Sequence, residues 1–179
     1  MSTTGLKKTA KNLKSNYQIL ELDELYWFIN EKSDTETREN IYVLSSVSRT
    51  PRHIVGIEAA LDKSPERIQA LVDNAPEALR YCTDGDLAYI DVAFPGKHIR
   101  CVGNKNDTFT VEGVNADLRH YIPLLRRRSR CFPRSLDTLN AVLEVFAEAF
   151  NKFGDAKLKF RQNRDPRSRE LPFGLVDFL

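Results

Sequence analysis

The stretch from Gln18 to Ile29 constrains the fold more than any other part of the chain. Its sequence, QILELDELYWFI, carries aliphatic or aromatic side chains at both odd and even positions. Successive side chains of a strand point to opposite faces of a sheet, so this pattern predicts a strand buried on both faces. A sheet covered on both faces needs packing partners on each side. The stretch therefore favours an α/β domain.

Apolar patterning and turn residues predict the elements that follow this strand. In order, they are strands at 41–48 and 53–59, a helix from Ser64 to before Pro76, strands at 79–83 and 98–102, and helices at about 111–128 and 135–154. The Ser64 hydroxyl is expected to cap its helix, and Pro123 to kink or interrupt the helix at 111–128. This order suits a mixed sheet flanked by helices, the ribonuclease-H-like plan.

The last predicted helix carries one apolar stripe, which indicates core packing. The stripe consists of Leu136, Leu139, Leu143, Phe146, Phe150 and Phe153. We therefore expect a ribonuclease-H-like domain at 17–154, between a flexible basic lead-in at 1–16 and a basic C-terminal tail at 155–179.

Length and composition exclude several classes of protein. The 179 residues fit one domain, and no apolar run is long enough for a membrane span. The N-terminus has no apolar signal core, and the three cysteines are widely spaced, so neither a disulfide framework nor a zinc ribbon is indicated. A cytoplasmic protein that does not contact the membrane is expected.

Positive charge is concentrated late in the chain. Residues 117–170 contain thirteen Lys or Arg against seven Asp or Glu, although the net charge of the chain is only +2. The densest part comprises Arg126, Arg127, Arg128, Arg130 and Arg134. Such a stretch favours a polyanion such as DNA, since binding releases condensed counterions. A solvated helix face with a basic tail would have the same composition.

Three acidic residues stand out by their context. Asp23 lies within the buried strand, where an ionised carboxylate is costly unless it is paired or binds a metal. Asp84 follows a short apolar strand, at the end where α/β sheets gather their sites. Glu112 shares a helix face with Asn115 and Arg119. Glu24 and Asp86 are rival candidates on the same reasoning.

Oxygen ligands of this kind suit Mg²⁺ or Mn²⁺. Two such ions can activate a water or a 3′-hydroxyl and stabilise the leaving oxygen of a phosphodiester. The sequence shows no phosphate-binding Gly-rich loop and no nucleophile elbow, and the lone histidines read as structural or exposed.

Four local matches at these acids resemble the catalytic part of insertion-sequence-one family transposases, which belong to the DDE group. They are Glu21-Leu22-Asp23-Glu24; Thr83-Asp84-Gly85 with Tyr89 and Gly96-Lys97-His98; Thr108, Glu112, Asn115, Leu118 and Arg119; and Phe132-Pro133-Arg134-Ser135. Their order and spacing cover about residues 21–153. The family usually has arginine and then often histidine after the glutamate, where this chain has Gly113 and Val114, and arginine is also common at the position of Thr110.

The resemblance implies a ribonuclease-H-like fold and a transposase that uses two Mg²⁺ or Mn²⁺ ions to cleave and transfer DNA strands. It assigns Asp23, Asp84 and Glu112 as catalytic metal ligands and places Asn115 and Arg119 near the substrate phosphate. It also implies assembly on transposon ends as a homo-oligomer, with an upstream domain or reading frame that recognises DNA. Two alternatives stay open on the residues: a non-catalytic DNA-binding or regulatory derivative of the fold, and another nuclease on the same fold.

Overall fold

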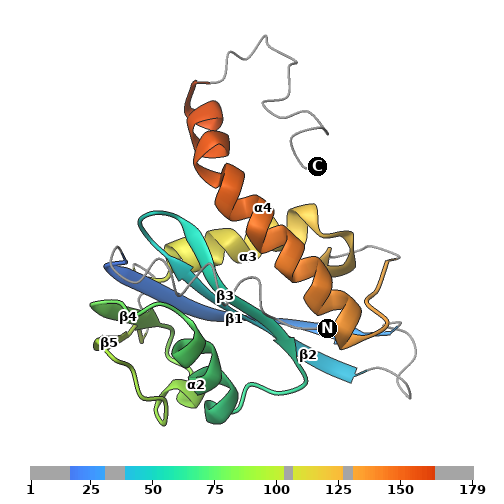
Figure 1. Cartoon of the computed structure of the whole chain (residues 1–179). Helices are drawn as coiled ribbons and strands as arrows, with labels where there is room; N and C mark the ends of the chain where they lie inside the picture. The colour runs from blue at the N-terminus through green and yellow to red at the C-terminus, as the bar shows by residue number, and fades with distance from the viewer. Residues whose placement is uncertain (1–16, 31–38, 103–106, 127–130, 164–179) are drawn as a thin grey trace.

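The computed structural model describes residues 17–30, 39–102, 107–126 and 131–163, with side chains as far as residue 153. Its elements are β1 (Ile19–Ile29), β2 (Glu39–Ser48), β3 (His53–Ala60), α2 (Pro65–Asn74), β4 (Arg80–Thr83), the 3-10 turn η1 (Leu87–Tyr89), β5 (Lys97–Arg100), α3 (Phe109–Tyr121), the 3-10 turn η2 (Pro123–Leu125) and α4 (Leu136–Asn163). Five strands form one mixed sheet, flanked by helices on both faces (Figure 1). The α/β class and the flanked mixed sheet predicted from the sequence are confirmed.

The sheet has the order β3-β2-β1-β4-β5, with β1 at its centre. β1 pairs antiparallel with β2, and β2 pairs antiparallel with β3. On the other side β1 pairs parallel with β4, and β4 pairs parallel with β5. The sequence of β1 predicted a strand buried on both faces. In the structure β1 has a neighbouring strand at each edge and a helix layer on each face, so its central position agrees with this prediction.

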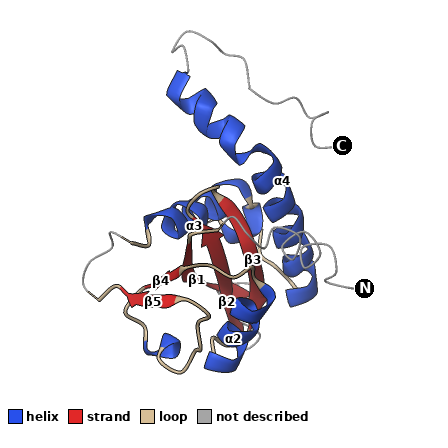
Figure 2. Ribbon diagram, turned by 60° about the vertical axis from the view of Figure 1, so that its left-hand side comes forward, coloured by secondary structure: helices blue, strands red, loops and turns tan. Residues whose placement is uncertain are grey.

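The two faces of β1 supply two separate cores. Leu25, Trp27 and Ile29 pack on the face covered by α3 and α4, whereas Leu20 and Leu22 pack on the face covered by α2. Figure 2 shows the sheet between these layers, with the C-terminal part of α4 extending beyond it. Five of the six residues of the predicted apolar stripe lie in the first core, with Leu139, Leu143 and Phe150 buried and Leu136 and Phe146 packed against them; Phe153 is not part of this core.

Two asparagines of α4 bind the backbone of β3, which is an edge strand. The Asn151 amide donates to the Ile54 carbonyl (2.8 Å) and accepts from the Ile54 N–H (2.7 Å). Asn140 makes the same pair of hydrogen bonds with Ala59, at 3.1 and 2.7 Å. The eleven-residue interval between the two asparagines corresponds to a helix rise of ~16 Å, and the five-residue interval between their partners on β3 corresponds to ~17 Å of strand. The two lengths match, so both asparagines can reach the strand. α4 thereby covers backbone groups that an edge strand would otherwise expose.

Three local expectations need correction or refinement. The Ser64 hydroxyl does not cap α2; the Ser64 carbonyl accepts from the Arg67 and Ile68 N–H groups instead. Pro123 interrupts the helix at 111–128 as expected, so α3 ends at Tyr121 and a 3-10 turn follows. α4 does not end at Gly154 but continues to Asn163, because one glycine costs only about 1 kcal/mol and residues 155–163 are rich in good helix formers.

Within the described part of the chain, none of the helices combines the length and the apolar character that crossing a membrane requires.

The core beneath α4 yields a stability prediction. Leu143 is fully buried in the α3/α4 core, whereas Val145 on the same helix is 68% exposed. Leu143→Ala is expected to lower the free energy of unfolding by about 2–5 kcal/mol, since it removes buried methyl groups and leaves a cavity. Val145→Ala serves as the matched control and should change it by less than about 0.5 kcal/mol. Urea unfolding followed by circular dichroism measures both; equal effects would contradict the assignment of this helix face.

Candidate metal centre

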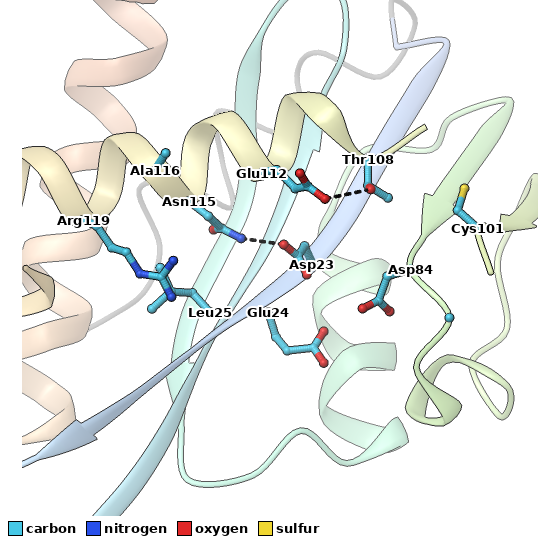
Figure 3. Close-up of a pocket in the computed structure, with 11 residues that line it drawn as sticks. Asp23, Glu24, Leu25, Asp84, Cys101, Thr108, Glu112, Asn115, Ala116 and Arg119 are labelled. Carbon is cyan, nitrogen blue, oxygen red and sulfur yellow. Dashed lines mark hydrogen bonds between the residues drawn. The ribbon is translucent and has the colours of Figure 1, made fainter. Parts of the chain in front are cut away.

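The three predicted acids line one open pocket of about 590 Å³, between α3 and the carboxyl end of β4. Figure 3 shows the carboxylates of Asp23, Glu24, Asp84 and Glu112 around this space. The complete lining is Asp23, Glu24, Leu25, Asp84, Gly85, Cys101, Thr108, Glu112, Asn115, Ala116 and Arg119. Residues from a strand, a strand end and a helix, far apart in sequence, thus meet in one place.

The register of the sheet brings the two aspartates together. β1 and β4 run parallel, and Leu22 is paired with Thr83. Asp23 and Asp84 are the next residues on the two strands, so they lie side by side where β4 ends. The Thr83 hydroxyl also bonds to His98 Nε2 on β5 (2.9 Å), which ties the end of β4 to its other neighbour. Parallel pairing therefore explains why an acid within one strand and an acid after another face the same pocket.

Glu21 fixes the beginning of α3 on β1. Its side chain is fully buried, and its Oε2 accepts hydrogen bonds from the backbone N–H groups of Thr110 (2.7 Å) and Val111 (2.9 Å). N–H groups in the first turn of a helix have no partner within the helix, and the positive end of the helix dipole favours a carboxylate there. Because Glu21 stands two residues before Asp23 on the same face of β1, this contact sets Glu112 opposite Asp23.

Arg49 balances the charge of this buried carboxylate. Its Nε donates to Glu21 Oε1 at 2.7 Å, and its Nη2 donates to the Asp107 carbonyl at 3.0 Å. The guanidinium also lies 4.8 Å from the centre of the Phe109 ring. One arginine after β2 therefore connects β1 to the residues that lead into α3.

A chain of hydrogen bonds orients Asp23. Asn115 Nδ2 donates to Asp23 Oδ2 at 2.8 Å, and the Ser45 hydroxyl donates to Asn115 Oδ1 at 3.3 Å. The Ser45 contact fixes which end of the Asn115 amide faces the carboxylate. Asn115 is thus already engaged in holding Asp23, a more specific placement than the sequence indicated.

The surroundings of Asp23 disfavour its negative charge. The pKa of Asp23 is raised from 3.8 to about 6, mainly by burial and also by the charges of Glu24 and Asp84, while the hydrogen bonds from the Glu24 N–H and from Asn115 act in the opposite direction. A buried carboxylate beside other carboxylates is stabilised by a cation.

Glu24, a rival candidate that also lines the pocket, has its carboxylate engaged by other side chains. Its Oε1 accepts from Lys63 (2.6 Å) and its Oε2 accepts from the Tyr89 hydroxyl (2.8 Å). Lys63 also pairs with Asp86, the second rival. Burial lowers the pKa of Lys63, but its bonds and charge contacts with Asp86 and Glu24 raise that pKa above the ordinary value overall. Since both rivals are ion-paired with Lys63, they are weaker candidates for metal ligands than Asp23 and Asp84.

The candidate ligands on β4 and α3 already accept hydrogen bonds from other groups of the protein. Asp84 Oδ1 accepts from the Asp86 N–H at 2.9 Å, and Glu112 Oε1 is 3.5 Å from the Thr108 hydroxyl. Among the described residues, no group of three or more His, Cys, Asp or Glu side chains is arranged to hold a metal ion. The donors fit a hard cation by chemistry, but side chains would have to turn toward a common point to ligate one.

The predicted DNA-binding residues are only partly in the pocket. Arg119 lines it, one helical turn beyond Asn115 (Figure 3). Arg126 and Arg134 are exposed and lie outside the lining. Arg127, Arg128 and Arg130 lie outside the described residues.

The positions that depart from the family pattern do not line the pocket. Thr110 and Val114 are buried, and Val114 belongs to the α3/α4 core. Gly113 faces Arg52, whose Nη2 would lie 2.9 Å from a Cβ built there and which pairs with Asp117 at 3.6 Å. The space beside residue 113 is thus occupied by a guanidinium from the loop before β3.

Sequence reasoning missed two contributors to this region. Glu21 appeared only as part of a motif, because nothing in a single sequence shows that a strand acid meets a helix start 89 residues later. Cys101 lines the pocket although isolated cysteines carry no signal by spacing. Burial, and then the charge of Asp107, raise the pKa of the Cys101 thiol.

No protein-family model matches the chain, and no curated protein matches it.

The role of Glu21 can be tested by stability. Glu21→Leu is expected to lower the free energy of unfolding by about 2–5 kcal/mol, because it strands a largely buried guanidinium and two helix N–H groups. Asp107→Ala removes a more exposed partner of the same Arg49 and should cost at most about 1 kcal/mol. Chemical denaturation of both variants measures the difference. A Glu21→Leu effect as small as the control would show that the buried pair does not anchor α3.

The raised pKa of Asp23 predicts that removing the Asp23 carboxylate stabilises the protein, whereas removing the Glu21 carboxylate destabilises it. The native state holds the Asp23 proton up to about pH 6 and the unfolded state only to about 3.8, so this residue lowers stability as pH rises through that window. Without divalent ions, Asp23→Asn should therefore be more favourable at pH 8 than at pH 4, by about 1–3 kcal/mol. Denaturation in EDTA at both values measures it; Asp91→Asn, at an exposed position, should show no such change. A pH-independent Asp23→Asn effect would contradict the assignment.

Proposed function

We propose that this protein is the catalytic part of a DNA transposase of the DDE group, similar to the insertion-sequence-one family, that cleaves DNA strands and transfers them. The observation that carries the proposal is the meeting of Asp23, Asp84 and Glu112 on the wall of one pocket. The five-stranded mixed sheet with helices on both faces is compatible with the ribonuclease-H-like fold that this function implies.

In this proposal Asp23, Asp84 and Glu112 hold two Mg²⁺ or Mn²⁺ ions. The bound ions would activate a water or a 3′-hydroxyl and stabilise the leaving oxygen of the phosphodiester. The pocket supplies oxygen donors, which hard cations prefer, and it is large enough for a sugar–phosphate unit beside them. Excess negative charge around Asp23 supports a cation as the missing partner.

Other residues have separate roles in the same proposal. Asn115 and Ser45 orient the Asp23 carboxylate. Arg119 presents a guanidinium to the pocket, where its planar donors suit two oxygens of a phosphate. Recognition of the transposon ends falls to an upstream region or partner, and the reaction to a homo-oligomer assembled on DNA.

The proposal is tested by DNA nicking and strand transfer with the full chain, supplied with a DNA end and Mg²⁺ or Mn²⁺. Asp23→Asn, Asp84→Asn and Glu112→Gln are each expected to reduce the rate by at least about 100-fold, or ~2.7 kcal/mol in the barrier. Each variant should also lose the rise in melting temperature that Mn²⁺ produces in the unaltered protein.

Asp91→Asn is the matched control, because it removes one exposed carboxylate away from the pocket lining and should retain full activity. Activity retained by all three pocket variants would overturn the proposal. DNA binding without any metal-dependent cleavage would instead identify a non-catalytic derivative of the fold.

A further inference from the structure

An exposed aromatic ring lies at the start of α3, next in the chain to a residue that lines the acidic pocket, although the ring is not itself part of the lining. Phe109 is the first residue of α3, and 56% of its surface is exposed. The residue before it, Thr108, lines the pocket. Glu112 and Ala116, three and seven residues later, line the pocket as well, and these spacings place them on the same edge of the helix as Phe109. Figure 3 shows this part of α3 above the carboxylates.

Arg49 supports this ring. The guanidinium carbon is 4.8 Å from the ring centre, within the range of a cation–π contact. Arg49 cannot move freely, since it is bonded to the buried Glu21 and to the Asp107 carbonyl. The ring is thus backed by a cation held in place by three contacts, while much of its surface remains in water.

The two other exposed aromatic side chains of the described residues have different settings. The Tyr26 hydroxyl donates to Asn40 at 2.6 Å. Tyr121, at the far end of α3, packs edge-on against His120. None of the three aromatic residues is among the lining residues of the pocket. Phe109 has no polar atom of its own, so its exposed surface offers a partner a flat apolar contact.

The bases of single-stranded nucleic acid are unpaired and have flat faces, and they stack on exposed aromatic rings of proteins. We propose that Phe109 is the stacking platform for one unpaired nucleobase of the strand whose phosphodiester enters the acidic pocket, with Arg49 holding the ring from behind. This subsite rests on the proposed function, because a nucleic-acid strand must reach the pocket. Stacking accepts every base, so the subsite selects a position along the strand and not a sequence.

The test is a double-mutant cycle between the ring and a base. The full chain is titrated, in Ca²⁺ so that no strand is cut, with short DNA duplexes that carry a single-stranded end. An abasic nucleotide is moved one position at a time along that end. At one position the missing base should weaken binding about 5- to 100-fold for the unaltered protein.

Phe109→Ala should weaken binding of the intact DNA by a similar factor and become insensitive to the abasic nucleotide at that position. Phe109→Trp should retain the binding and the sensitivity, because it keeps a flat ring. Tyr121→Ala, an exposed ring at the other end of the same helix, should behave like the unaltered protein.

If the losses of affinity caused by Phe109→Ala and by the abasic nucleotide are independent at every position, so that their factors multiply, the subsite is overturned. Absence of binding to any of these DNAs would overturn it as well. Loss of cleavage in the three pocket variants, together with such multiplying effects, would reject the subsite while leaving the proposed function standing. Coupling at one position in a protein that never cleaves DNA would reject the proposed function and keep the subsite.

Discussion

The structure depends on one buried carboxylate. Glu21 joins the centre of the sheet to the start of α3 through two backbone N–H groups, and Arg49 makes its burial tolerable. The Asn115–Asp23 hydrogen bond is a second directional contact between β1 and α3, whereas the apolar packing between them is not directional. Together, the bonds at the helix start and the bond from Asn115 define the rotation of α3 and its position along β1. The distance between Asp23 and the acid on the helix follows from these attachments.

The acids around the pocket fall into two electrostatic groups. Glu24 and Asp86 share an ion pair with Lys63 within the fold. Asp23 has an amide for a partner and carboxylates for neighbours, so its ionised form is disfavoured. A fold selected for stability alone would replace such a residue, because buried charge without a counterion is costly. Of two adjacent acids on β1, Glu24 has a cationic partner within the described part of the protein and Asp23 does not, and this difference supports a binding role for Asp23.

The sequence predicted the central strand and the flanking helices, because each left a local signal. Local context marked the three pocket acids but left Glu24 and Asp86 as rivals, and the family resemblance selected among them. Asp23 interrupts an apolar strand, and Asp84 ends one. The Glu21 contact could not be predicted, since it depends on a helix start that is distant in sequence. The sequence predicts too short an α4, because Gly154 resembles a helix end although good helix formers follow it. The basic cluster illustrates another limit: charge density marks a region but does not place Arg126 or Arg134 relative to the pocket.

The paired asparagines of α4 constrain how this protein can change over evolution. Asn140 and Asn151 grip β3 at two points whose separation is the same along helix and strand. Inserting one residue between them would rotate one amide about 100° around the helix and detach it, although no apolar residue had been lost. The interval between the two asparagines on α4 and the interval between their partners on β3 therefore constrain each other. Relatives of this chain should vary in loop length far more readily than in this interval.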